Sequence, residues 1–138
     1  MERSLVLIKP DAMQRGLAGV IIGRLQGEGL KLIALRMLHM DKALAEHHYA
    51  VHKGKSFFND VIEYITSTPI VAAAFEGEGV VRRIRELMGA TDPAKAAPGT
   101  IRKDYGLDLQ RNSTHASDSP ENGEKEIALF FTKKEIFR

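Results

Sequence analysis

Leu5-Val-Leu-Ile-Lys-Pro-Asp11 (LVLIKPD) begins with four consecutive apolar residues and stops at a lysine, a proline and an aspartate. An apolar run without polar alternation predicts a short β-strand that is buried on both faces. Proline ends such a strand, because it has no backbone N–H to give to a neighbouring strand. We therefore expect a first strand over residues 5–8 that is followed by a turn beginning at Lys9.

The segments beyond this strand show helical and strand-like patterns in turn. They predict a helix over 17–25, a strand over 30–39, helices over 43–48 and 57–65, a strand over 70–75 and a helix over 80–88. Asp41 is a suitable N-cap for the second of these helices. Ser119, followed by Pro120, marks the start of a closing helix that carries Ile127 and Phe130. The pattern indicates a mixed α/β chain without internal repeats.

Residues 89–119 lack any periodicity, and we expect a long loop there. So long a loop within a compact domain is typical of a functional or a disordered segment. Order is favoured, because the charges are mixed in sign and the segment contains apolar anchors at Ile101, Tyr105, Leu107 and Leu109.

The composition predicts one domain over residues 1–138 and excludes several classes of protein. The chain is 43% hydrophobic and has a formal net charge of +2, so neither nucleic acid nor a membrane is indicated as its main partner. The absence of cysteine excludes disulfides and thiolate chemistry. The N-terminal apolar run is too short for a signal peptide or a membrane span, and we expect a cytoplasmic protein.

The stretch RNSTHASDS, residues 111–119, places His115 among hydroxyl, amide, arginine and carboxylate groups. Such residues are also common in solvated turns, so this segment alone leaves both interpretations open. The helix expected from Ser119 adds unpaired N–H groups, which favour an anion. A phosphate-transfer site with His115 as nucleophile is favoured by the anion-binding groups elsewhere, at Lys9, Arg85, Thr91, Arg102 and Arg111.

The remaining histidines are expected at the surface. His48 and His52 are four residues apart, a spacing that can chelate a metal, but their stretch lacks the glutamate of a zinc-protease helix. Phe57 and Phe58 are adjacent, so both cannot point into one core. We expect one to be buried and the other to be available for stacking on a flat ligand.

Four ordered segments carry a resemblance to a known family. They are LIKPDAMQRGLAGVIIGRL from Leu7, HYAVHKGKSFF from His48, RELMGATDPAKAAPGTIRKDYG from Arg85 and RNSTHASDSPENGEKEIALFF from Arg111. Together they resemble nucleoside diphosphate kinases over essentially the whole chain. The resemblance implies a ferredoxin-like α/β sandwich with a four-stranded antiparallel sheet. It also implies Mg²⁺-dependent transfer of the γ-phosphoryl group from a nucleoside triphosphate, mainly ATP, to a nucleoside diphosphate through a phosphohistidine, with ping-pong kinetics.

The resemblance also implies roles for individual residues. His115 matches the nucleophile, Glu126 the carboxylate that orients its imidazole, Ser117 a nearby hydroxyl and Tyr49 a tyrosine close to the nucleophile. Phe57 matches the aromatic that stacks on the base, and Asn112 the amide that binds the ribose 3′-hydroxyl. The groups that hold the phosphates fall on Lys9, Arg85, Thr91 and Arg102. No protein ligand is expected for the metal, which the phosphates would carry, with Asp118 reaching it at most through water.

The sequence departs from the family pattern at several positions. Ala116 follows the histidine where glycine is usual, Ser56 replaces a proline, Asn122 a common serine and Phe130 a frequent tryptophan. Gly123 interrupts the closing helix, and we expect a cost of about 1 kcal/mol relative to alanine. The family assembles as tetramers or hexamers, so a homo-oligomer of either size is expected.

Two other functions are compatible with parts of this pattern. A catalytically silent nucleotide-binding or regulatory module can share the same fold, because fold does not determine function. His115 together with Lys9, Asn112 and Glu126 argues against that alternative, since a module that only binds does not need them. A histidine phosphatase is disfavoured, because the one arginine-glycine pair, Arg15-Gly16, has no histidine attached.

Overall fold

A computed structural model describes residues 1–138 and contains one four-stranded antiparallel sheet with the strand order β2-β3-β1-β4. The strands are β1 (Glu2–Ile8), β2 (Lys31–Leu38), β3 (Ile70–Gly77) and β4 (Thr114–Ala116). Strand β1 lies between β3 and β4, which explains its unbroken apolar run. Leu5, Val6, Leu7 and Ile8 are completely buried. The expected ferredoxin-like α/β sandwich is confirmed by this topology.

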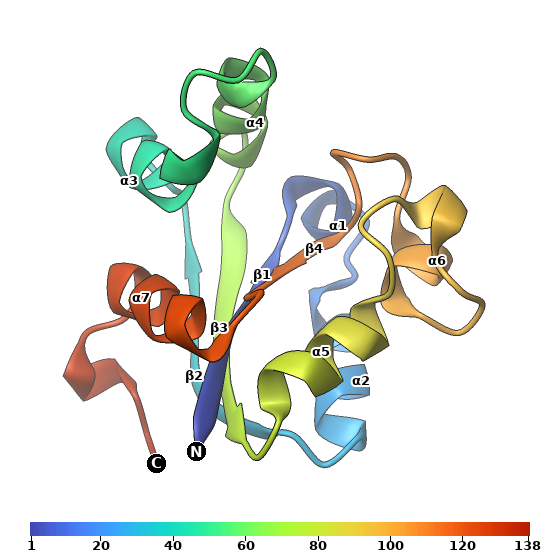
Figure 1. Ribbon diagram of the computed structural model, residues 1–138, viewed down its shortest axis with the longest axis vertical. Coiled ribbons are helices and arrows are strands. Elements are labelled where there is room, and N and C mark those ends of the chain that lie inside the picture. Colours follow the sequence, from blue (N-terminus) through green and yellow to red (C-terminus); the bar gives the residue numbers. More distant parts are fainter.

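Helices cover both faces of the sheet (Figure 1). On one face lie α3 (Lys42–His48), α4 (Phe58–Ile65) and α7 (Pro120–Phe130), and on the other α1 (Pro10–Gln14), α2 (Ala18–Gly27), α5 (Val80–Met88) and α6 (Ile101–Tyr105). Short 3₁₀ turns occupy Ala50–His52, Pro93–Lys95 and Lys133–Glu135. Alternate residues of β1 point to opposite faces, so Leu5 and Leu7 join one core and Val6 and Ile8 the other.

The predicted helix starts are confirmed at two caps. The Asp41 side chain accepts a hydrogen bond from the Leu44 N–H, and the Ser119 hydroxyl accepts one from the Asn122 N–H. None of the helices combines the length and the apolar character that crossing a bilayer requires.

The expectation of a structureless segment over residues 89–119 was wrong. This segment contains α6 and the whole of β4, which is the fourth strand of the sheet. Strand β4 has three residues, Thr114, His115 and Ala116, and its place at the sheet edge comes from pairing with β1. Three residues of mixed polarity carry no recognisable period, so only the long-range pairing reveals the strand.

Gly123 is required by the packing of α7 on β1. A Cβ atom at this position would lie 2.1 Å from the Arg3 carbonyl oxygen, so only a residue without a side chain lets the helix approach the strand. The expected interruption is not observed, because α7 runs unbroken through Gly123, and the close contact with Arg3 is not revealed by the sequence. Position 116, by contrast, does not require glycine. Ala116 lies in the extended strand β4, and its side chain joins the core.

Gly123→Ala is expected to destabilise the protein by about 1–3 kcal/mol, the usual cost of forcing an extra carbon into a packed contact. The gain in helix propensity, about 1 kcal/mol, offsets only part of this cost. The matched control is Gly23→Ala within α2, where an added Cβ meets no atom within 4 Å. Urea unfolding should show a lower free energy of unfolding for Gly123→Ala and an unchanged or higher one for Gly23→Ala. Equal values for both variants would contradict the packing argument.

Candidate active site

His115 lies at the centre of β4, opposite Leu7 of β1. Paired residues of neighbouring strands share a face, so the imidazole points to the face that α3, α4 and α7 cover. Its Nε2 atom is 3.2 Å from Oε1 of Glu126, which α7 supplies. The sequence placed His115 in a loop, whereas the structure holds it on a strand whose backbone is bonded to β1.

Glu126 is held by a second hydrogen bond. The Ser117 hydroxyl donates to the same Oε1 atom at 2.6 Å and accepts from the Leu5 N–H at 2.9 Å. Burial by itself would raise the pKa of Glu126, but the hydrogen bond and charge of His115, together with Ser117, hold that pKa below its usual range. The carboxylate is therefore ionised and fixed in place beside the imidazole.

The hydrogen bond between His115 and Glu126 determines the tautomer of the neutral ring. A carboxylate can only accept, so Nε2 carries the proton and Nδ1 keeps its lone pair. No hydrogen bond in the structure engages Nδ1. The arrangement leaves a nucleophilic nitrogen in an oriented ring, which is the requirement for covalent catalysis by histidine.

Lys9, two residues beyond the strand partner of His115, is half-buried and held by two hydrogen bonds. Its Nζ donates to Oδ1 of Asn112 at 2.9 Å and to the Gln110 carbonyl at 3.2 Å. Burial and the charge of Arg102 lower the pKa of Lys9 to about 8, although Asp11 and Asp108 act in the opposite direction. An ammonium group has three donors, so one remains for a ligand.

Arg102 adds positive charge near Lys9, and Arg85 adds positive charge near Arg102. Arg102 donates to the carbonyl oxygens of Gly89 at 3.0 Å and Thr114 at 3.1 Å, while its buried Nε–H has no partner. Burial and the charge of Arg85 lower the pKa of Arg102 to about 10. These cations repel one another in the free protein, so the arrangement favours an anion.

Asn112 connects Lys9 to the loop after α5. Its Nδ2 donates to the Thr91 carbonyl at 2.9 Å while Oδ1 accepts from Lys9. An amide has two donors and two acceptor lone pairs, so one of each remains available. The Thr91 and Arg85 side chains are exposed, and the structure shows no protein partner for either of them.

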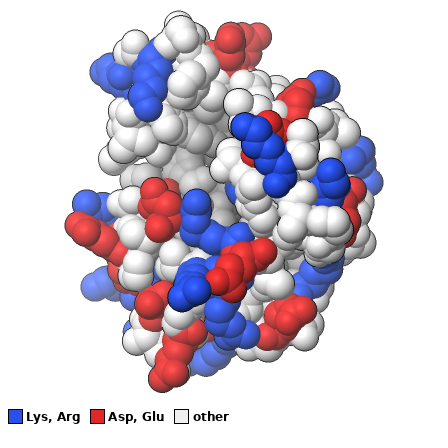
Figure 2. Space-filling view, turned by 45° about the vertical axis from the view of Figure 1, so that its right-hand side comes forward, with Lys and Arg blue, Asp and Glu red and all other residues white.

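Figure 2 shows a hollow on the molecular surface below the α3–α4 hairpin, with Lys and Arg side chains among those along its lower border. Phe57 is 43% exposed and Phe58 is buried, as the adjacent pair predicted. Burial and the charge of Glu126 raise the pKa of Tyr49, so its phenol stays neutral near this carboxylate.

His48 is the residue that the sequence interpretation missed. It was expected at the surface, but its ring lies edge-on to His115 with the centroids 4.7 Å apart, and both of its nitrogens are buried without a partner. Burial, followed by the neighbouring His115, lowers the pKa of His48 to about 3, so it is neutral near physiological pH. Nothing in the local sequence around His48 indicates that its ring is packed against His115.

Arg111, considered as an anion-binding group from the sequence, has another partner. Its guanidinium forms two hydrogen bonds to Asp108, at 2.8 and 2.6 Å, on the exposed loop. Arg111 is thus paired with Asp108, whose charge also acts on the pKa of Lys9.

The donor atoms do not form a dedicated magnesium cage. His48, His115 and Glu126 are the one group of three that offers metal-ligand atoms within 4.8 Å of each other, and two of the three are imidazoles. Magnesium prefers oxygen ligands, so this group does not suit it. Asp118 and Arg85 both border one open cavity of about 490 Å³.

The class of protein that this fold and this site define is a phosphotransferase on a ferredoxin-like sandwich. A family model described as nucleoside diphosphate kinase matches residues 2–136. The chain belongs to the nucleoside diphosphate kinase family. The resemblance drawn from the sequence motifs is thereby confirmed, and nothing in the comparisons favours a silent regulatory module.

Individual relatives and solved structures agree with this assignment. Nucleoside diphosphate kinases from Dehalococcoides mccartyi and Archaeoglobus fulgidus are 56% and 54% identical over 136 residues, which cover 99% of this chain and 96% and 90% of theirs. The enzyme of Halobacterium salinarum in complex with CDP has a TM-score of 0.96 and 47% identity, covering 99% of this chain and 91% of that one. The Aquifex aeolicus enzyme has a TM-score of 0.95 and 42% identity over 98% of both chains.

Proposed function

We propose that His115 is the phosphoryl carrier of this kinase. The lone pair of Nδ1 attacks the γ-phosphorus of a nucleoside triphosphate, mainly ATP. A bond between Nδ1 and phosphorus forms as the bridging bond to the β-phosphate oxygen breaks, and the nucleoside diphosphate leaves. A second nucleoside diphosphate then attacks the phosphohistidine through its terminal phosphate oxygen and departs as the triphosphate. Donor and acceptor use the same site in turn, which predicts ping-pong kinetics.

One observation carries this proposal. Nε2 of His115 is bonded to a carboxylate while Nδ1 is free, in a site that also holds Lys9 and Arg102. Glu126 stabilises the positive charge that develops on the imidazole during attack, and Ser117 keeps Glu126 oriented. A neutral phenol at Tyr49 supplies a donor near this carboxylate.

The nucleotide contacts follow from the unused donors of the site. Lys9 binds the phosphoryl group in transit, and the phosphates of the nucleotide also bind to Arg85, Thr91 and Arg102. Asn112 binds the ribose 3′-hydroxyl through its remaining N–H. Phe57 stacks on the base, and because every base has a π-face, we expect little discrimination among bases.

Mg²⁺ enters this proposal as an ion carried by the nucleotide phosphates, with Asp118 reaching it at most through water. When bound, such an ion neutralises phosphate charge and restricts the phosphate chain to one conformation. The residues of the chain provide the remaining positive charge through Lys9 and the two arginines.

The proposed assembly is a homo-oligomer, a tetramer or a hexamer. Strand β2 is an edge of the sheet eight residues long, and its Leu35 and Met37 are 53% and 66% exposed. An exposed edge with apolar side chains is a surface that proteins usually cover. We further propose that residues 1–138 act as one domain and that the enzyme is cytoplasmic, where its nucleotide substrates are used.

The direct test is a brief incubation with γ-labelled ATP in the absence of an acceptor. Label that stays on the protein in base and is lost in acid identifies a phosphohistidine, and adding a nucleoside diphosphate should discharge it as the labelled triphosphate. Protein that takes up no label, or that keeps its label when an acceptor is added, would contradict the proposed function.

The activity is expected to fall above pH 8, because Lys9 has a pKa of about 8 and is needed in its charged form. The proton is present below this pKa and lost above it, so kcat/KM for nucleotide, which reports the free enzyme, should decline with rising pH. Lys9→Arg should remove this decline, even if the variant is slower, since a guanidinium stays charged. A wild-type profile that is flat to pH ~10, near the ordinary lysine pKa, would refute the assignment.

A further inference from the structure

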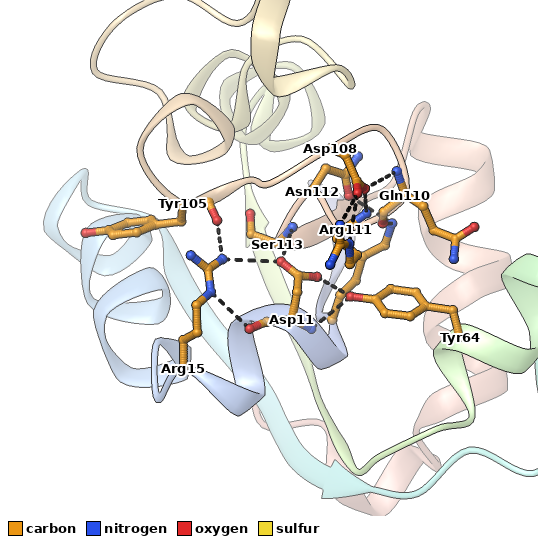
Figure 3. Close-up of polar contacts among 10 residues, drawn as sticks. Asp11, Arg15, Tyr64, Tyr105, Asp108, Gln110, Arg111, Asn112 and Ser113 are labelled. Carbon is orange, nitrogen blue, oxygen red and sulfur yellow. Dashed lines mark hydrogen bonds and ion pairs between the residues drawn. The ribbon is translucent and has the colours of Figure 1, made fainter.

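Asp11 lies in α1, two residues after Lys9, and has no role in the mechanism described so far. It is 3% exposed, although it carries a carboxylate. A buried carboxylate is costly unless hydrogen bonds compensate it, so its partners indicate what it does. Figure 3 shows groups from three separate segments directed at this side chain.

The partners of Asp11 come from α4 and from the start of β4. The Tyr64 hydroxyl donates to Oδ1 at 2.5 Å and accepts from the Asp11 N–H at 2.9 Å. The Ser113 N–H donates to Oδ2 at 3.0 Å, and Arg15 approaches the same oxygen at 3.4 Å. The carboxylate therefore joins α1, α4 and the segment that leads to His115.

Ser113 is the point at which this connection affects the site. Its φ of 73° makes it the one non-glycine residue of the chain with positive φ, a conformation that disfavours a side chain. Both of its backbone polar groups are bound to the segment after β1, since its N–H donates to Asp11 and its carbonyl accepts from the Lys9 N–H at 2.9 Å. Its neighbour Asn112 is bonded to the Lys9 ammonium group.

We propose that Asp11 is a positioning residue for phosphoryl transfer. Its carboxylate holds Ser113 in the left-handed turn, so that Asn112 and His115 keep a fixed position relative to Lys9. Through Tyr64 it also connects α4, which begins beside Phe57, to this turn. Asp11 thus sets the spacing between the stacking surface for the base and the groups that act on the phosphates and the 3′-hydroxyl. This inference rests on the roles proposed above for Lys9, Asn112 and His115.

The positions of these groups matter more to the chemistry than to affinity. Several contacts share the binding of a nucleotide, whereas transfer requires the nucleophile and the phosphorus to be aligned. A shift of about 1 Å in a reacting group costs up to ~10²-fold in rate. Loss of the Asp11 carboxylate should therefore slow the phosphorylation of His115 while leaving nucleotide affinity nearly unchanged.

The test uses Asp11→Asn, which keeps the size of the side chain but replaces one acceptor oxygen with a donor. Single-turnover phosphorylation by saturating ATP should slow by ~10-fold to 10²-fold, with the nucleotide Kd within about threefold of wild type. Discrimination against 3′-deoxy-ATP should also decrease, because Asn112 is no longer held in a fixed position relative to Lys9. The matched control is Asp104→Asn, which removes a carboxylate from the ion pair of α6 with Arg24.

The pH profile gives a second readout, which reports the charge of Asp11 acting on Lys9. Asp11 and Asp108 raise the pKa of Lys9, whereas burial and Arg102 lower it, and Lys9 in turn acts on His48. Removing the charge of Asp11 should therefore move the alkaline decline in kcat/KM to lower pH.

Tyr64→Phe keeps the proposal testable if Asp11→Asn does not fold. It removes one donor from Asp11 and leaves the bond to Ser113, so the phosphorylation rate should fall by a smaller factor than in Asp11→Asn. Tyr105→Phe is its control, since the Tyr105 hydroxyl makes no hydrogen bond in the structure. The hydrogen bond from Arg15 goes to the backbone carbonyl of Tyr105, which this substitution leaves in place.

The outcomes separate this proposal from the proposed function. If wild-type protein is not phosphorylated on His115, the proposed function fails. If wild type is phosphorylated and a folded Asp11→Asn or Tyr64→Phe variant reacts at the wild-type rate, the positioning role alone is overturned. Equal losses of rate and affinity would also overturn it, because they would indicate general damage to the site.

Discussion

Replacing His115 with alanine is expected to abolish the phosphoenzyme and to lower kcat by ~10⁴-fold or more, the scale on which covalent enzymes lose activity without their nucleophile. The reason is that Nδ1 of His115 is the one nitrogen of this ring that no protein group engages. The fold should survive, because the ring is 22% exposed and its side chain makes one hydrogen bond. ADP binding should remain, because Lys9 and Arg102 keep their own partners.

The measurements are label uptake from γ-labelled ATP, steady-state turnover and ADP affinity. His47→Ala is the matched control, since His47 is an exposed histidine on α3. Parallel double-reciprocal lines are expected for wild type, as the same site serves both substrates. Acid-labile label that persists in His115→Ala would show that another residue, His48 being the nearest imidazole, carries the phosphoryl group.

Removing the 3′-hydroxyl of the nucleotide is expected to lower the rate of His115 phosphorylation by ~10²-fold or more, with a much smaller effect on affinity. We further propose that this hydroxyl donates a hydrogen bond to the bridging oxygen that leaves with the diphosphate. Such a bond strengthens as negative charge builds on the oxygen, so it stabilises the transition state more than the bound substrate. Asn112 is suited to orient the hydroxyl, because it keeps one free N–H beside the Lys9 ammonium group.

The test compares single-turnover phosphorylation by ATP, 2′-deoxy-ATP and 3′-deoxy-ATP at saturation. The first two should react at similar rates and the third slowly. Asn112→Ala should lose part of this preference, whereas Gln26→Ala, an exposed amide on α2, should keep all of it. Equal rates for ATP and 3′-deoxy-ATP would mean that the hydroxyl only assists binding and that Asn112 has another role.

Much of the fold could be predicted from local patterns. The apolar run of β1, the N-caps Asp41 and Ser119 and the apolar stripe of α5 each report their own conformation, because burial and capping act on residues close in the chain. Strand β4 could not be found this way. Its residues form a strand because β1 lies alongside, and pairing between segments more than a hundred residues apart leaves no local signal.

The candidate site also has residues that could be predicted from the sequence and residues that could not. Residue type nominated His115 and Lys9, since a reaction with phosphate needs a nucleophile and cations. The resemblance to the family added Asn112 and Glu126. The sequence assigned His48 to the surface and gave Asp11 no role beyond ending a strand. Both are defined by what surrounds them: His115 beside His48, and Tyr64 and Ser113 around Asp11.

The sequence by itself determined the class of fold, the family and the chemical groups available for phosphoryl transfer, because these depend on which residues are present and in what order. Only the tertiary structure decided which nitrogen of His115 is free, how far the pKa of Lys9 is lowered and why residue 123 is a glycine. Each of these depends on distances between atoms from separate segments. Hydrogen bonding, desolvation and steric contact all change over a few ångströms, a scale that spacing along the chain does not contain.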